Sequence, residues 1–293
     1  MDGSIEVQTA RSRPVRAKAA AVAIMLHVLA ATSVRAQTEL PFSAGERLHY
    51  RVSAGRLGSI GEGVMSVDGP VDIRGTCALV LRSEVHARVG FMKTSERAES
   101  WIDPTRMATL RYAKRARGPF SSADERVELF PSDQRWEDQR GRVGESPTTQ
   151  PLDELSFIYF LRTMTLDAVT IDSIVRHYDR ERNPVVVRVL GRDTIRTKAG
   201  TFATVTVEMR VKDPQRYRGE GVIRIHLSDD AFRYPVRIES TVPMLGRMVL
   251  TLDSIATPSP SIAGQQHHPT RMSGEPSRAR SSTYPGNFPS PPD

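Results

Sequence analysis

His177, Asp179 and Glu181 are the residues whose types and spacing come closest to a catalytic set. They lie in one charged segment ahead of Pro184, and a histidine near carboxylates is what a hydrolase uses to activate water or a nucleophile. A charged segment that runs into a proline is also typical of a solvated loop, and we favour that interpretation. A hydrolase with a site assembled across strands is therefore the alternative function.

Signatures of other reactions are missing from the sequence. It holds no HExxH, no GxSxG, no Walker loop and no GxGxxG that opens a helix. His49, His86 and His226 lie on the charged faces of alternating segments, which predicts solvent-facing side chains and not metal ligands. The glycine-rich residues 58–63 fall between two strand patterns, which is typical of a turn or bulge. We therefore expect no catalytic residue, no cofactor and no bound metal.

Arg111, Lys114 and Arg115 are the candidate contacts for an anionic partner. They surround Tyr112, in a chain with 41 basic and 34 acidic residues and a formal charge of +7. Such a charge balance attracts anionic lipid headgroups or cell-wall polymers. The alternative is that these charges keep an exposed strand edge from pairing with other edges. The sequence contains no nucleic-acid-binding motif, so we expect no nucleic acid partner.

Cys77 is the only cysteine of the chain. A single thiol allows no internal disulfide, so stability has to come from packing. Cys77 begins an apolar run over residues 77–81, which predicts a small buried side chain. A reactive thiol is the alternative.

The first 36 residues have the composition of a secretory signal peptide. Arg11, Arg13, Arg16 and Lys18 lead into an apolar run over residues 19–31, and small residues precede a cut after Ala36. The run is shorter than the roughly 20 residues that a membrane-spanning helix needs. We therefore expect an exported protein, in the periplasm or outside the cell, with no transmembrane segment in the mature chain.

The rest of the chain divides into one long patterned region and a tail. Residues 257–293 are rich in proline and serine and have almost no apolar periodicity, which predicts a disordered tail. Residues 37–256 are long enough for one domain with a substantial core.

Alternation of apolar and charged residues dominates residues 37–256. Leu79, Leu81 and Val85 share one face, whereas Arg82 and Glu84 take the other. The same period of two recurs over residues 185–189, 205–211, 223–227 and 248–252. Such alternation indicates strands with one buried face. Glycine and proline punctuate these runs, and nothing helical separates most of them, so the sheet is expected to be antiparallel.

One segment has helical spacing instead. Between Pro151 and Arg162, apolar residues recur three and four positions apart. Pro151 suits the first helical position, and Asp153 and Glu154 complement the positive end of a helix. Because this helix lies between two groups of strands, we expect it to pack across the concave face of the sheet.

Five stretches occur in an order and spacing that resemble a known family. They are Pro41 to Tyr50, Leu152 to Arg162, Thr197 to Phe202, Leu227 to Asp230, and Tyr234 to Ile238. Together they resemble domain-of-unknown-function family 3108, a group of exported bacterial proteins, over residues 40–253. The resemblance implies an envelope protein built mainly of antiparallel strands, and it brings no catalytic residues with it.

These observations predict a mainly β fold. The expected domain is one strongly curved antiparallel sheet, a half-barrel or clam-like shape, with the helix on its concave face. The expected function is non-catalytic: binding a hydrophobic or amphipathic envelope molecule such as a lipid, or acting as a scaffold. A docking role toward another envelope protein is the third possibility. The candidate cavity-lining residues are Leu155, Ile158, Tyr159, Val207 and Ile225.

Overall fold

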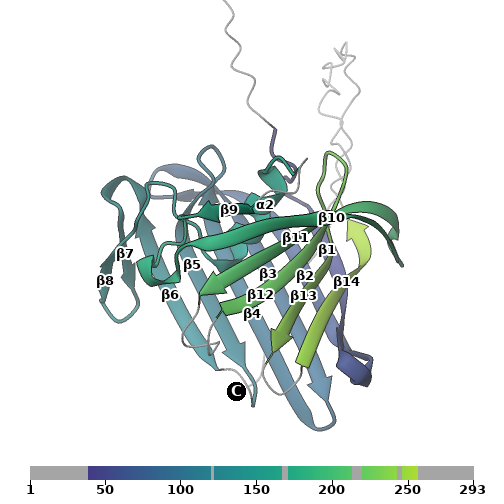
Figure 1. Ribbon diagram of the computed structural model, residues 1–293. Helices are drawn as coiled ribbons and strands as arrows, with labels where there is room; N and C mark the ends of the chain where they lie inside the picture. The colour runs from purple at the N-terminus through teal and green to yellow at the C-terminus, as the bar shows by residue number, and fades with distance from the viewer. Residues whose placement is uncertain (1–38, 120–121, 167–170, 213–219, 243–245, 257–293) are drawn as a thin grey trace, which may run out of the picture.

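The computed structural model describes residues 39–119, 122–166, 171–212, 220–242 and 246–256. Within these residues the chain forms one 14-stranded sheet and one α-helix (Figure 1). The predicted signal peptide and tail lie outside the described residues.

The strands range from three to 15 residues in length. They are β1 (Arg47–Ala54), β2 (Ser59–Ile73), β3 (Thr76–Val89), β4 (Met92–Asp103), β5 (Ala108–Arg117), β6 (Ala123–Phe130), β7 (Arg135–Asp138), β8 (Val143–Glu145), β9 (Ile171–Ile174), β10 (Val185–Thr197), β11 (Gly200–Lys212), β12 (Glu220–Ser228), β13 (Pro235–Val242) and β14 (Gly246–Ala256). The α-helix is α2 (Glu154–Thr163), and three short 3₁₀ helices are η1 (Gly55–Leu57), η2 (Pro131–Asp133) and η3 (Arg180–Arg182).

The sheet order is β8-β7-β6-β5-β4-β3-β2-β1-β14-β13-β12-β11-β10-β9. Almost every strand therefore pairs with its neighbour in the sequence, and all these pairs are antiparallel. One pair joins strands that are far apart in the sequence: β1 and β14, the first and last strands of the domain, which are also antiparallel. The mainly β fold and the antiparallel pairing are thus confirmed.

The curvature of the sheet differs from the expectation. Strands β8 and β9 are its two edges, so hydrogen bonds do not close it. It is also not strongly curled, so the strong curvature predicted for a half-barrel is not found. A sequence pattern shows which face of a strand is buried, but the amount of bending depends on bulges and side-chain volumes along the whole sheet.

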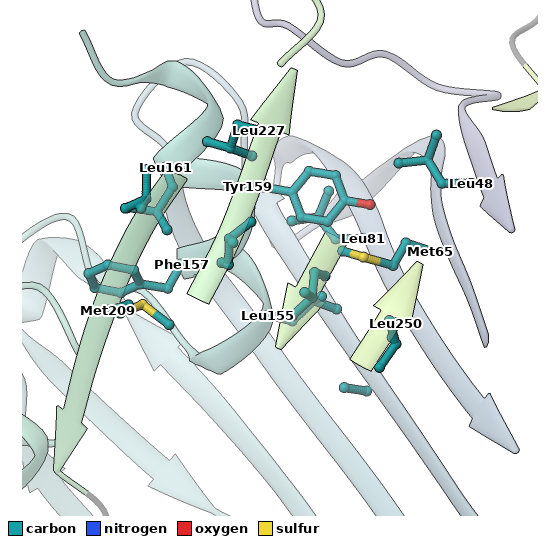
Figure 2. Close-up of a cluster of buried hydrophobic side chains, with 14 of the residues drawn as sticks. Leu48, Met65, Leu81, Leu155, Phe157, Tyr159, Leu161, Met209, Leu227 and Leu250 are labelled. Atoms are coloured by element: carbon teal, nitrogen blue, oxygen red, sulfur yellow. The ribbon is translucent and has the colours of Figure 1, made fainter. Parts of the chain in front are cut away.

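One hydrophobic core joins the two halves of the sheet. Buried side chains of β1, β2 and β3 share a cluster with those of β11, β12 and β14, and α2 adds its own (Figure 2). Leu48, Leu81, Leu227 and Leu252 are all fully buried in it. The alternation seen in the sequence has therefore placed one face of each of these strands against the same core.

The helix α2 is confirmed, but it begins later than predicted. Asp153, and not a residue before Pro151, is its N-cap: the carboxylate accepts hydrogen bonds from the backbone N–H groups of Leu155 (2.8 Å) and Ser156 (3.0 Å). Leu152 instead makes a β-bridge with His177. The helix packs against β3 and β4, near the upper end of the sheet in Figure 1.

Cys77 corrects another expectation, because its side chain is exposed. It lies opposite Asp72, close to the β2–β3 turn. Its neighbour Ala78 is buried with Ile73 and Leu110 in a small second cluster on the other face of the sheet. Residues 77–81 therefore do not share one environment. Cys77 is exposed near the strand end, Ala78 is buried in the second cluster, and Leu81 is buried in the main core.

Candidate functional site

The five candidate lining residues all lie in or against the main core. Leu155 and Tyr159 of α2 are buried, as are Val207 of β11 and Ile225 of β12, and Ile158 is partly buried against them. Figure 2 shows Leu155 and Tyr159 directed toward side chains of the sheet. All five residues therefore belong to the main hydrophobic core or pack against it.

Burial decreases along several strands in the same direction. On β3 the large apolar side chains of the inner face run from buried Leu81 to partly exposed Val85 and Val89, while the small side chain of Ala87 between them is buried. On β12 it runs from buried Ile225 to partly exposed Ile223. The same change occurs from Met209 to Val211 on β11 and from Leu250 to Met248 on β14.

The partly exposed apolar side chains therefore gather at one end of the sheet, which we call the open end. It is formed by the β1–β2 connection, residues 55–58, the β3–β4 turn, residues 90–91, and the adjoining strand ends. Both connections lie at the lower side of the sheet in Figure 1, away from α2. Here solvent reaches the inner, apolar face.

The opposite end is held by a buried ion pair between Glu46 and Arg162. Two parallel hydrogen bonds join them, from Nη1 to Oε1 (2.7 Å) and from Nη2 to Oε2 (2.8 Å). Nη2 also donates to the backbone oxygens of Pro41 (2.8 Å) and Phe232 (3.0 Å). Because α2 supplies Arg162, these contacts anchor the helix to the segment before β1 and to the turn before β13. We call this the closed end.

Aromatic rings surround the Arg162 guanidinium. Its carbon lies 5.1 Å from the centre of the Phe42 ring, 5.2 Å from that of Tyr159 and 5.8 Å from that of Tyr234. Burial by itself would lower the pKa of Arg162, but the hydrogen bonds and charge of Glu46 outweigh it and the pKa is raised. The arginine therefore stays charged, with its charge matched by Glu46.

A second polar network lies beside α2. Lys114 Nζ is 2.6 Å from Glu154 Oε2 and 3.8 Å from Glu96, and Arg182 Nη1 is 2.7 Å from Glu154 Oε1. The Tyr178 hydroxyl donates to Glu125 (2.8 Å). These contacts join β4, β5, α2 and η3.

The three candidate anion contacts do not share one face. Lys114 is almost fully buried and points toward α2, whereas Arg115 is exposed and lies 3.8 Å from Asp124. Arg111 is partly exposed, pairs with Glu128, and lies over the Trp101 ring. Alternation along β5 places Arg111 and Arg115 on the face opposite to Lys114.

The candidate hydrolase residues form a structural turn. His177 Nδ1 accepts a hydrogen bond from the backbone N–H of Asp179 (3.0 Å), and the Asp179 carboxylate accepts one from the backbone N–H of Glu181 (3.0 Å). No imidazole–carboxylate bond is therefore formed among these three residues. Burial, helped by the nearby charge of Arg182, lowers the pKa of His177 to about 4.

Sequence reasoning missed a different histidine cluster, on the outer face of β11–β13. Thr206 Oγ1 lies 2.9 Å from His226 Nδ1, and His226 Nε2 lies 3.6 Å from Glu239 Oε1. The residues are neighbours only because the strands pair in register, Thr206 with His226 and Arg224 with Glu239. Burial lowers the pKa of His226, so its imidazole is neutral near neutral pH. Alternation in the sequence carried no signal for such a cross-strand set.

The residues that the structure describes contain no group of three or more histidine, cysteine or acidic side chains arranged to hold a metal ion. None of their helices combines the length and the apolar character needed to cross a membrane.

The sequence matches the family described as "Protein of unknown function (DUF3108)" over residues 48–253. The chain belongs to the DUF3108 family. No curated protein matches the sequence.

Among solved structures, this DUF3108 chain is similar to a beta-barrel-like protein of domain of unknown function DUF1849 from Brucella abortus. That likeness has a TM-score of 0.51 at 10% identity and covers 73% of this chain and 98% of the other.

Two weaker likenesses do not define a fold. One is to a "putative lipoprotein" from Parabacteroides distasonis, with a TM-score of 0.29 at 11% identity over 73% of this chain and 95% of that one. The other is to a "putative exported protein with YmcC-like fold" from Bacteroides fragilis, with a TM-score of 0.27 at 12% identity over 74% and 97%.

Three of the five stretches that resemble DUF3108 in the sequence meet at the closed end. Glu46 comes from the first stretch, Tyr159 and Arg162 from the helix, and Tyr234 from the last. The Tyr50 hydroxyl also donates to the backbone oxygen of Pro235 (2.9 Å). In this chain these motif residues therefore hold the closed end of the fold together.

Proposed function

We propose that this DUF3108 protein is an exported, non-catalytic envelope protein that binds a hydrophobic or amphipathic molecule at the apolar inner face of its sheet. The observation that carries the proposal is the decrease of burial toward the open end. Val85, Val89, Ile223 and Met248 present apolar surface there without complete cover. A ligand that covered them would gain roughly 25 cal/mol for each Å² of apolar surface removed from water.

Such a ligand would lie along the inner face of the sheet, with α2 at the end of that face away from the opening. Leu155, Ile158, Tyr159, Val207 and Ile225 would then form the floor on which it rests, with the partly exposed residues above them. Small-molecule sites of this kind are mostly apolar, with a few polar groups that fix orientation. Lys114 lies on this inner side, and Arg111 and Arg115 lie outside it.

Export is part of the proposal and is supported by residues 1–36. The basic residues, the apolar run and the small residues before Gln37 have the arrangement of a cleaved signal peptide. Sequencing the N-terminus of the protein recovered from its own envelope tests this directly. A start at Gln37 is expected, and an intact Met1 in the envelope fraction would contradict it.

A hydrolase is the second candidate, and one observation favours it. Thr206 Oγ1 lies 2.9 Å from His226 Nδ1, and His226 Nε2 lies 3.6 Å from Glu239 Oε1. This order of side chains resembles a nucleophile, a base and an orienting acid. Against it, the Thr206 hydroxyl lies on the outer face of a flat strand surface. A scaffold that docks to another envelope protein is the third candidate.

Native mass spectrometry of protein purified from its own envelope, followed by lipid extraction, tests the binding proposal. We expect a bound apolar or amphipathic species and a higher melting temperature than that of the delipidated protein. Reproducibly empty protein, whose melting temperature no envelope lipid changes, would overturn the proposal. Hydrolysis of ester substrates that is lost in T206A and H226A would favour the second candidate instead.

A further inference from the structure

The open end carries a groove on β2–β5 that none of the functions above uses. Its volume is about 660 Å³. Strand register places one polar row across it, from Glu62 through His86 and Ser95 to Arg117. Arg88 and Lys93 complete the lining beside the β3–β4 turn. The groove is therefore mainly basic.

Arg88 and Lys93 face each other directly across the β3–β4 pair. Like charges in directly opposed positions destabilise a sheet. Within the described residues, neither side chain makes an ion pair, and Arg88 Nε donates only to the backbone oxygen of Gly90 (3.1 Å). An anion between them would remove this repulsion, so the pair itself points to an anionic partner.

Arg117 is the third cation of the groove. It donates to the backbone oxygens of Ala116 (2.9 Å) and Ala123 (3.1 Å) and lies 3.4 Å from Asp124. Those contacts partly neutralise it and fix its position. Glu62 is the one acidic residue among the groove's lining residues, so the groove keeps an excess of positive charge.

Apolar side chains project beside these cations. Phe91, in the β3–β4 turn, is 91% exposed, and Leu57, in the β1–β2 connection, is 56% exposed. Since β2 and β3 are neighbours, the two connections lie at the same end of adjacent hairpins. Exposed apolar tips next to lysine and arginine are typical of surfaces that bind the interface of an anionic membrane.

We propose that the open end docks onto an anionic phospholipid bilayer. Phe91 and Leu57 enter the interfacial region, while Arg88 and Lys93 contact lipid phosphates. Docking in this orientation turns the partly exposed apolar residues of the inner face toward the membrane. It requires no bound ligand, so it stands or falls separately from the binding proposal.

Sedimentation of the full chain with lipid vesicles tests the docking. We expect binding to vesicles of phosphatidylglycerol and phosphatidylcholine, with much weaker binding to phosphatidylcholine alone. The double variant R88Q/K93Q should bind the anionic vesicles roughly 25-fold more weakly, at about fivefold for each cation removed near the surface. F91S should weaken binding roughly tenfold through the loss of buried apolar surface.

Two matched variants control for general changes of charge and hydrophobicity. R106Q removes an exposed arginine from the β4–β5 turn, at the other end of these strands, and I171S removes an exposed apolar side chain from the edge strand β9. Both should bind vesicles like the unmodified protein. Since all substituted side chains are exposed, melting temperatures should change little.

Several outcomes would overturn the docking. One is equal binding to neutral and anionic vesicles, and another is a loss with R106Q or I171S as large as with R88Q/K93Q. Binding of a soluble anionic cell-wall polymer without vesicle binding would show that the cations serve a different partner. A vesicle-binding protein that stays empty in native mass spectrometry would keep the docking and remove the binding proposal.

Discussion

The ion pair between Glu46 and Arg162 connects the beginning of the domain to the helix α2. Both side chains are almost completely removed from solvent. Removing two charges from water costs several kcal/mol for each, which good geometry repays only when the remaining donors are also bonded. Here the carbonyl oxygens of Pro41 and Phe232 accept further hydrogen bonds from Nη2, but the buried Nε of Arg162 has no partner among the described residues. The pair therefore specifies where α2 lies more than it adds net stability.

The variant E46Q tests this role. It leaves the Arg162 charge buried without its counter-charge, and we expect a loss of about 3–5 kcal/mol in the free energy of unfolding. Urea titration followed by circular dichroism measures it. R47Q is the matched control, because Arg47 is half exposed and 3.9 Å from its partner Asp68, and it should change stability by less than about 0.5 kcal/mol. Equal effects of the two variants would contradict the role.

His177 gives a prediction for the dependence of stability on pH. Its pKa of about 4 in the folded protein lies below the value of 6.5 for an unperturbed histidine, so the unfolded chain binds more protons between these values. Stability is then fully present above pH 6.5 and falls as the pH drops through 4, by up to about 3 kcal/mol from this residue.

The variant H177N should make this pH dependence shallower, because asparagine has no proton to take up and its oxygen can still accept from the Asp179 N–H. Unfolding free energies at several pH values between 4 and 7 measure the slope. H86N replaces an exposed histidine and should leave the slope as it is. An unchanged slope in H177N would mean that other groups cause the acid sensitivity.

At the scale of elements, the start of α2 is set by a buried carboxylate. Asp153 accepts from the hydroxyls of Ser100 (2.6 Å) and Thr109 (2.7 Å) in addition to the two backbone N–H groups of the helix. Burial raises the pKa of Asp153, although its hydrogen bonds with Ser100, Thr109 and Ser156 oppose the shift. One side chain thus caps the helix and fixes it to β4 and β5.

Two substitutions of Asp153 should separate the contribution of its capping hydrogen bonds from that of its charge. D153A removes the cap and leaves the buried Ser100 hydroxyl without its acceptor, whereas the Thr109 hydroxyl keeps that of Ser156 as a partner. We expect a loss of at least about 2 kcal/mol in unfolding free energy. D153N keeps an acceptor oxygen for the helix and should lose clearly less. Urea titration of both variants decides, and equal losses would show that the charge, and not the cap, matters.

The same helix shows how far the sequence could be used. Spacing of apolar residues predicted a helix before Arg162, because that spacing reports one buried face. It did not predict that Leu152 would pair with His177, since a bridge between distant residues has no local signal. The exposure of Cys77 was missed for a related reason: residues 77–81 lie where the core ends, and only the register with β2 shows this.

At the scale of the whole molecule, the strand order decides where apolar surface stays open. Ile223, Ser240 and Met248 form one row across β12, β13 and β14. The sequence pointed to Val207 and Ile225, which are at the centre of their strands and prove to be fully buried. The residues that solvent reaches, Ile223 and Val211, lie two and four positions nearer the connections, and no single strand's pattern distinguishes them from the core.

This distinction leads to a prediction for the ligand-binding face. Ile223 is partly exposed and packs at the margin of the core, so I223N should fold, but a ligand would lose an apolar neighbour and gain an amide that has to be desolvated. We expect roughly tenfold weaker binding of a fluorescent fatty acid. L190N substitutes a 41%-exposed leucine of β10 outside the main core and should bind normally.

The buried variant I225N completes this comparison, because it places an amide in the filled part of the interior. It should lower the melting temperature strongly, whereas I223N should lower it little. Loss of ligand binding in I223N at unchanged melting temperature therefore locates the ligand at the open end. If I223N and L190N bind the probe equally, the ligand does not lie on the partly exposed face, because an amide introduced there would weaken its apolar contact with the ligand.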